Sequence, residues 1–161
     1  MYDISLFLFG ILLLYGAICD VKTFEIPNFV SVGGGLLFVP AALGEHLGPL
    51  EVFSHLSAAG VVLVLGFVLF VKNIFGGGDA KLLSVAALWC GFSGLLPLLF
   101  WVSTVGGVIS LILIAFRMSR MPVRYQSIGW LSQLHGEKGI PYGVAISFGS
   151  LAVLIGNLPG K

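Results

Sequence analysis

The sequence predicts an all-α membrane protein, a polytopic bundle of about six transmembrane helices with both termini extracytoplasmic. Hydrophobic residues make up 58% of the 161 residues and charged residues only 9%, and the mean hydropathy is +1.08. These values lie far outside the usual range of soluble domains. The apolar residues gather in blocks close to the roughly 20 residues that a helix needs to cross the hydrocarbon. No polar stretch is long enough for a second domain, so we expect residues 1–161 to form a single integral membrane domain.

The first apolar block, residues 4–19, follows an acidic residue, Asp3, and has neither a basic start nor a small-x-small cleavage site. We therefore expect a retained first helix rather than a cleaved signal peptide. Three further blocks, each predicted to form one helix, cover residues 28–44, 52–71 and 140–157.

The uncharged stretch at residues 82–116 is too long for one membrane crossing. Its middle, CGFSGLLP at residues 90–97, contains glycine and proline, which favour a break. We expect two helices here, the first of them short. Small residues also allow close contact between membrane helices. The candidates for such contacts are Gly33, Gly34, Gly35, Gly106 and Gly107.

Lysine and arginine favour cytoplasmic loops, and this bias predicts the orientation of the bundle. They fall in the first, third and fifth loops, whereas the second loop has neither and the fourth has no charge. Both termini are therefore predicted on the outer side. Asp20 and Asp79 border the first and third loops, so both are expected on the cytoplasmic side. The basic residues of these loops are Lys22, Lys72, Lys81, Arg117, Arg120, Arg124 and Lys138.

Asp20 and Asp79 need an explanation, because an ionised aspartate within the bilayer costs on the order of 3 kcal/mol. Two carboxylates within hydrogen-bond reach in a buried site repel each other and share one proton, so one is a base and the other an acid. Such a pair can activate water against a peptide carbonyl without a metal or cofactor. Taken singly, each aspartate could instead be a helix-end residue that faces water, with Asp79 as an N-terminal cap.

Three glycines, Gly76, Gly77 and Gly78, stand directly before Asp79. A glycine has no Cβ, so the backbone here can pass close to an extended substrate, which a Cβ at Gly78 could obstruct. The glycines therefore indicate a steric role beside the second aspartate.

Two motifs resemble those of the type IV prepilin peptidases, membrane aspartyl proteases of the G-x-G-D class. The first is CDVKTFEIPN, in which Asp20 ends the first helix and a short loop ends in Ile-Pro-Asn. The second is GGGDAKL, in which the glycines and Asp79 fill the G-x-G-D pattern. PYGVAI at residues 141–146 is similar to the start of the closing helix of this family. The resemblance covers almost the whole chain.

The resemblance implies an endopeptidase with Asp20 and Asp79 as the catalytic pair. It would cleave the basic leader of prepilins and pilin-like proteins on the cytoplasmic side of the inner plasma membrane, just before their hydrophobic N-terminal helix. Its partners would be these substrates and membrane lipid. Larger family members carry a cytoplasmic domain with paired cysteines after the first helix and also methylate the new N-terminus. The first loop here has no room for that domain, so the chain is similar to the small, peptidase-only enzymes of tight-adherence (Flp-type) pili, without a methyltransferase or zinc domain.

Residues around the two aspartates are candidates for substrate binding or support. Lys81 is either a cytoplasmic loop marker or a residue that holds the neighbouring aspartate ionised or binds a substrate carbonyl. Lys22 and Glu25 fit solvated loop charges, although Glu25 could meet the basic leader. Pro27 and Asn28 are expected to end the first loop and cap the second helix.

Cysteine and histidine spacing predicts no metal site and no cofactor. Cys19 and Cys90 stand far apart without a C-x-x-C partner, as small core hydrophobes do. His46, His55 and His135 have no ligand spacing. The net charge of +1 predicts no nucleic-acid partner.

Other interpretations stay open. Asp20 and Asp79 could relay protons or bind a cation in a small transporter or pilus-assembly subunit. Relay acids usually lie near mid-membrane, whereas these two stand at helix ends. An inactive scaffold protein would share the same fold. The presenilin-like branch of G-x-G-D proteases differs from this chain, because its first aspartate follows a Tyr and Asp20 here follows Cys19. The fifth loop, residues 117–139, is either a membrane-surface anchor or a docking surface.

Overall fold

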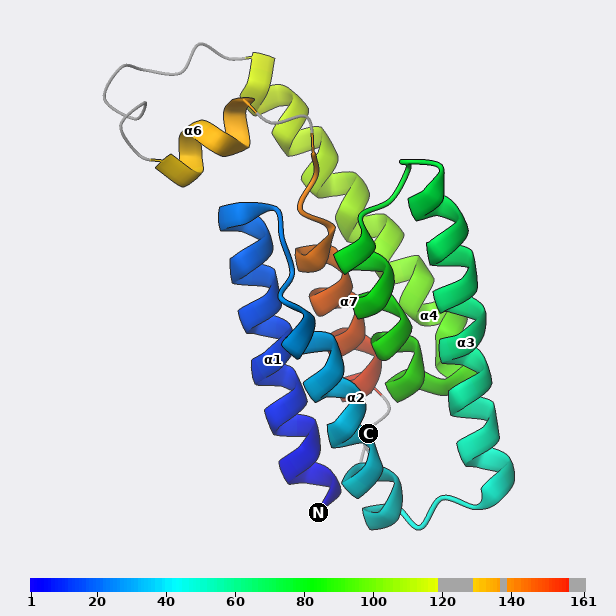
Figure 1. The fold of residues 1–161 in the computed structure, drawn as a ribbon. Coiled ribbons are helices and arrows are strands. Elements are labelled where there is room, and N and C mark those ends of the chain that lie inside the picture. The colour runs from blue at the N-terminus through cyan, green and yellow to red at the C-terminus, as the bar shows by residue number, and fades with distance from the viewer. Residues whose placement is uncertain (119–128, 137–138, 157–161) are drawn as a thin grey trace.

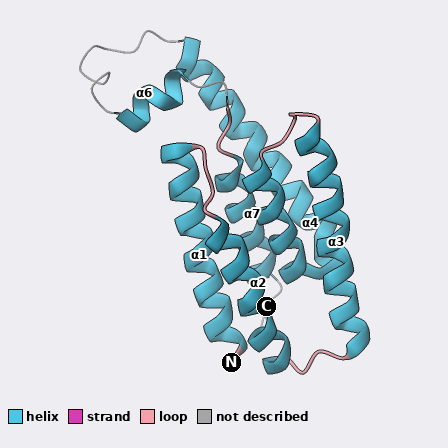
Figure 2. Cartoon of the chain, in the orientation of Figure 1, coloured by secondary structure: helices cyan, strands magenta, loops and turns pink. Residues whose placement is uncertain are grey.

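The computed structural model describes residues 1–118, 129–136 and 139–156, and these residues form helices and short connections (Figure 1). Strands are absent from the described ranges, so the predicted all-α class is confirmed (Figure 2). The helices are α1 (Tyr2–Thr23), α2 (Asn28–Gly44), α3 (Pro49–Val71), α4 (Gly77–Met118), α6 (Gly129–Gly136) and α7 (Tyr142–Gly156). The predicted block 28–44 has the bounds of α2, while α1 and α3 start a few residues earlier than the apolar runs that predict them.

Helix α4 consists of two limbs that reverse direction at Gly91 (Figure 1). Gly91 has φ 63° and ψ −176°, a conformation open almost only to glycine. A Cβ there would lie 3.1 Å from the His55 ring, so the turn has no room for a side chain. The first limb, residues 77–90, is short and the second limb, residues 92–118, is long. The predicted break in the apolar stretch is confirmed.

Neighbouring helices run antiparallel, as short connections require. Gly16 faces Val30, and Gly44 faces the first residues of the chain, so α1 and α2 pack along their lengths. In the same way Gly66 faces Ala80 across α3 and the first limb of α4. Loops 24–27 and 72–76 therefore lie at the same end of the bundle as the start of α7 (Figure 1). This end is called the site end below.

Helix α7 packs between α1 and the second limb of α4. The Ser147 hydroxyl donates a hydrogen bond to the Leu13 carbonyl at 2.8 Å. On its other side a Cβ at Gly149 would lie 2.8 Å from Val102. Small and hydroxylic side chains thus bring the helices close, as is common in membrane bundles.

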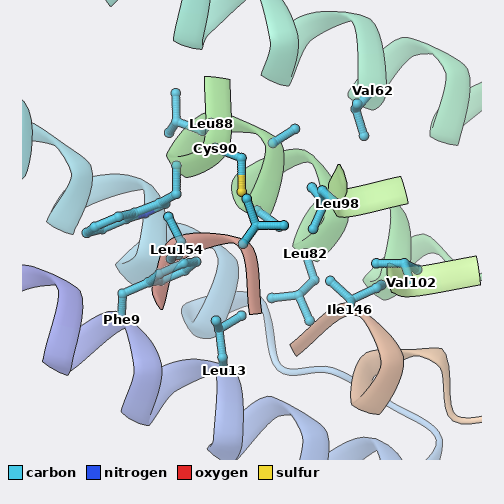
Figure 3. Packing of buried hydrophobic residues seen from close by; sticks show 14 of the residues in the cluster. Phe9, Leu13, Val62, Leu82, Leu88, Cys90, Leu98, Val102, Ile146 and Leu154 are labelled. Carbon is cyan, nitrogen blue, oxygen red and sulfur yellow. The ribbon is translucent and has the colours of Figure 1, made fainter. Parts of the chain in front are cut away.

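The core centres on Trp89, whose ring stacks on Phe9 with centroids 4.4 Å apart. Its indole N–H donates to the Gly34 carbonyl at 2.9 Å, so the buried polar atom is satisfied. A Cβ at Gly34 would lie 2.9 Å from Phe9, which confirms the expected close contact there. Gly35 has no atom within 4 Å of such a Cβ and plays no such role. Figure 3 shows the surrounding core, in which Leu13, Leu82, Leu98 and Ile146 are fully buried.

The outward faces of the helices are strongly apolar. Three helices, α1, α3 and α4, are long and apolar enough to cross a membrane, and α2 and α7 are shorter apolar helices. Large hydrophobic side chains such as Phe7, Phe67 and Leu96 are more than half exposed. Such a surface suits lipid rather than water, in agreement with a helical membrane protein. The number of crossings and the side of the termini stay predictions.

The fifth loop is described only in part. Residues 129–136 form α6 at the site end, and the Arg117 guanidinium donates hydrogen bonds to the carbonyls of Leu134 and Gly139 at 3.0 and 2.6 Å. The predicted loop markers Arg120, Arg124 and Lys138 lie outside the described residues.

Candidate active site

Asp20 lies in the last turn of α1 and is almost completely buried, with 4% of its surface exposed. Its Oδ2 accepts a hydrogen bond of 2.6 Å from the backbone N–H of Gly143, in the first turn of α7. Phe24 takes a left-handed conformation directly after α1, and its N–H donates to the Asp20 carbonyl at 2.9 Å. The carboxylate is therefore fixed by two helices and a tight turn.

Asp79 lies in the first turn of α4 and is half-buried. The Ala80 N–H donates to the Gly76 carbonyl at 3.0 Å, so Gly76 precedes the helix and Asp79 is its third residue. The interpretation of Asp79 as an N-terminal cap is therefore wrong, although an acid in a first turn is favoured by the helix dipole. A Cβ at Gly76 would lie 2.5 Å from the Asp79 Oδ2, so this carboxylate rests on the glycine.

Both carboxylates line the same two cavities at the site end. The smaller cavity has a volume of about 300 Å³ and the larger cavity about 570 Å³. They share four lining residues, Asp20, Phe24, Gly76 and Asp79. The structure thus brings two aspartates that are 59 positions apart in the sequence to the walls of the same two cavities.

The glycines before Asp79 make room for their neighbours. A Cβ at Gly77 would lie 3.1 Å from the Phe70 ring, and one at Gly78 would lie 3.2 Å from the Ile26 Cβ. The glycines therefore serve packing, because larger residues here would push α4 away from α3 and from loop 24–27. The predicted close approach of a substrate to these glycines stays a prediction.

Comparison with known proteins identifies the family of this chain. A family model described as the type IV leader peptidase family matches residues 7–111, which include both aspartates. The chain belongs to the type IV leader peptidase family. No curated protein and no solved structure matches it. Family membership supports a protease of the leader-peptidase kind in an apolar helical bundle.

The residues matched by the family model do not include α7, yet α7 also contributes to the site. Gly143 donates to Asp20, and a Cβ on it would lie 2.8 Å from the Asp20 Oδ2 and 3.0 Å from the Ile26 Cδ1. Sequence reasoning singled out the stretch PYGVAI without the role of its glycine. The signal available was a glycine in the first turn of an apolar helix, which is too common to identify a partner for Asp20.

Ile26 is a second site residue that sequence reasoning missed. Its side chain lies within 3.7 Å of the Cβ positions of three glycines, Gly16, Gly78 and Gly143. These glycines belong to α1, α4 and α7. The Ile26 side chain therefore lies between the three helices that form the site. An isoleucine in a loop motif carries no sequence signal for such a position.

Lys81 and Asn28 join the two motifs of the leader peptidase. The Lys81 ammonium donates a hydrogen bond of 2.9 Å to the Asn28 side-chain oxygen. Pro27 is the N-cap residue of α2, without a side-chain capping hydrogen bond, and Asn28 is the first residue of the helix. Pro27 thus ends the loop and occupies the cap position, as expected, but a proline side chain has no acceptor, so α2 has no side-chain cap.

The remaining predicted residues separate into two groups. Glu25 and Asn28 line the smaller cavity beside the aspartates. Lys22 is exposed in the last turn of α1 and lies against an apolar hollow with Trp130, outside both cavities. Within the described ranges no group of three or more metal-ligating side chains occurs.

Proposed function

We propose that this leader peptidase is an aspartyl endopeptidase that removes the basic leader of prepilins and pilin-like proteins. The main observation in support is that Asp20 and Asp79 line the same two cavities at one end of an apolar bundle. Two acids and an accessible space meet the chemical requirement for water activation. The family match supports a protease, and the short loop 24–27 supports a peptidase-only form.

In this mechanism the two carboxylates share one proton. The ionised carboxylate takes a proton from water while the water oxygen attacks the scissile carbonyl carbon. The protonated carboxylate donates a hydrogen bond to the carbonyl oxygen, where negative charge develops. When the C–N bond breaks, the proton taken from water is passed to the leaving nitrogen. The Gly143 N–H holds one carboxylate in position throughout, which limits the reorganisation that the reaction requires.

The helical substrate must open locally before this reaction can occur. A helix hides its peptide bonds within its own hydrogen bonds, and bare backbone is not tolerated in lipid. The cavities offer a protein-lined space in which a short extended segment can bind, and Gly76 has no side chain to block it.

The proposal includes cleavage on the cytoplasmic side of the inner membrane. Lys72 and Lys81 lie in or beside loop 72–76 at the site end, whereas loop 45–48 at the opposite end contains neither lysine nor arginine. This asymmetry supports a cytoplasmic site end, which is where a leader awaiting removal is found before export.

The test is cleavage of candidate prepilins in membranes that contain the wild type, Asp20→Asn or Asp79→Asn. Asp3→Asn is the matched control, because Asp3 is exposed at the opposite end of α1. We expect the wild type and the control to release the leader and both site variants to lose cleavage at equal expression. Cleavage by either site variant at the wild-type rate would show that its aspartate is not catalytic.

A further inference from the structure

We infer that the two cavities bind opposite sides of the scissile bond, with the basic leader in the smaller cavity and the first apolar residues of the helix in the larger. This inference rests on the proposed function and adds a direction of substrate binding. Glu25 is then the residue that recognises the leader. It lies in loop 24–27, outside the predicted catalytic pair.

The smaller cavity is acidic. Besides Asp20 and Asp79 its lining residues are Glu25, Asn28, three glycines and two apolar residues, and none of the described residues that line it is a lysine or an arginine. The nearby Lys81 ammonium donates to Asn28. A lining of this charge attracts lysine and arginine side chains and disfavours acidic ones.

The larger cavity has a different chemistry. Beyond the residues that it shares with the smaller cavity, most of its lining residues are aromatic or aliphatic, namely Phe70, Ile74, Phe75, Ile140 and Tyr142, and the other two are Asn73 and Gly139. The rings of Phe75 and Tyr142 lie 5.8 Å apart at 58°, so they form one corner of the wall. An apolar side chain that leaves water for such a wall is stabilised by the burial of its surface. A charged side chain would lose solvation there without an added partner.

The two aspartates that line both cavities determine the direction in which the substrate binds. Asp20 and Asp79 belong to both cavities, so a peptide bond between them has one neighbour in each cavity. A prepilin changes from basic to apolar at its cleavage point, and the lining changes from acidic to aromatic at the two aspartates. The leader therefore runs toward loop 24–27 and α2, and the new N-terminus of the helix lies between α3 and α7.

The first arm of the test exchanges charges. The full-length protein in membranes is assayed on a prepilin with a lysine- or arginine-containing leader and on the same prepilin with those residues changed to glutamate. We expect Glu25→Lys to lower kcat/KM on the basic leader at least tenfold, mainly through KM, and to cleave the acidic leader better than the wild type does. Glu45→Lys is the matched control, because Glu45 is exposed in the loop at the opposite end and should leave both substrates unchanged.

The second arm probes the larger cavity. Prepilins with Phe or Ala as the first residue after the scissile bond are compared for the wild type, Phe75→Ala and the milder Phe75→Leu. We expect the wild type to prefer Phe, Phe75→Ala to lose most of this preference and Phe75→Leu to keep part of it, whatever the change in absolute rate.

The outcomes separate the two proposals. If the wild type cleaves and the aspartate variants do not, but Glu25→Lys treats both leaders as the wild type does, the direction of binding proposed here is wrong. An unchanged preference in Phe75→Ala would overturn the assignment of the larger cavity. The proposed function itself, on which both assignments rest, would be overturned by either of two other results. The wild type would cleave none of the prepilins, or Asp20→Asn would keep full activity.

Discussion

Lys81 donates a hydrogen bond of 2.9 Å to the side-chain oxygen of Asn28, and this bond connects two motifs that are 53 residues apart in the chain. Asn28 is the first residue of α2. Asp79 lies in the first turn of α4, and Lys81 follows it two residues later. The bond therefore joins the loop that follows Asp20 to the helix that carries Asp79. Both segments contribute residues to the lining of the smaller cavity.

We predict that Lys81→Met and Asn28→Ala each lower the rate of leader cleavage about fivefold, the equivalent of ~1 kcal/mol for one lost hydrogen bond. The double variant should be little worse than either single variant, because both changes remove the same bond. The measurement is a double-mutant cycle on kcat/KM in membranes. Lys72→Met is the control, since Lys72 is an exposed lysine of the same loop region. Fully additive losses would mean that the two side chains act independently.

Substitution of Gly143 should damage the site more strongly. In Gly143→Ala the new Cβ would lie 2.8 Å from the Asp20 Oδ2, so the carboxylate or α7 must shift. A shift of about 1 Å in a catalytic group can cost ~100-fold in rate, and we expect a loss of that order in kcat. Gly107→Ala is the control, because a Cβ at Gly107 meets no atom of the described residues within 4 Å. Wild-type kcat in a folded Gly143→Ala protein would contradict a positioning role.

Ile26 should matter for spacing rather than for chemistry. Ile26→Ala removes side-chain atoms that contact α1, α4 and α7, so we expect the two aspartates to lose their relative position and kcat to fall about tenfold. Ile26→Val keeps the branched Cβ and should recover most of the rate. Ile18→Ala, on the exposed face of α1, should leave kcat unchanged. Equal rates for Ile26→Ala and Ile26→Val would show that the spacing does not depend on this side chain.

The turn at Gly91 yields a prediction on stability. Gly91→Ala forces a Cβ into a conformation that disfavours it and against the His55 ring, so the free energy of unfolding should fall by about 1–3 kcal/mol. Unfolding in mixed detergent micelles, followed by tryptophan fluorescence, measures this change. Gly60→Ala is the control, since a Cβ there meets nothing within 4 Å in the interior of α3, and alanine should stabilise that helix slightly. Identical unfolding curves for Gly91→Ala and the wild type would refute the steric account of the turn.

Local patterns were sufficient to predict much of this protein. The apolar blocks predict the helices because a helix that crosses the hydrocarbon layer needs about 20 consecutive, mostly apolar residues. Glycine and proline at residues 90–97 predict the break that is found at Gly91. Two motifs identify Asp20 and Asp79, because intramembrane acids are costly and therefore few. Each of these signals lies within one short stretch of the chain.

The tertiary structure alone decided what surrounds the aspartates. Gly143 and Ile26 contact Asp20 and the glycine loop from segments that share no pattern with them. Packing brings the Asn28 side-chain oxygen to Lys81, and Pro27 takes the N-cap position of α2. Glu25 lines the smaller cavity, whereas Lys22, three residues earlier, faces outward. The sequence by itself therefore determined the helices and the two acids, which depend on local composition. The cavities and the partners of each acid depend on contacts between distant segments, and only the packed bundle creates these.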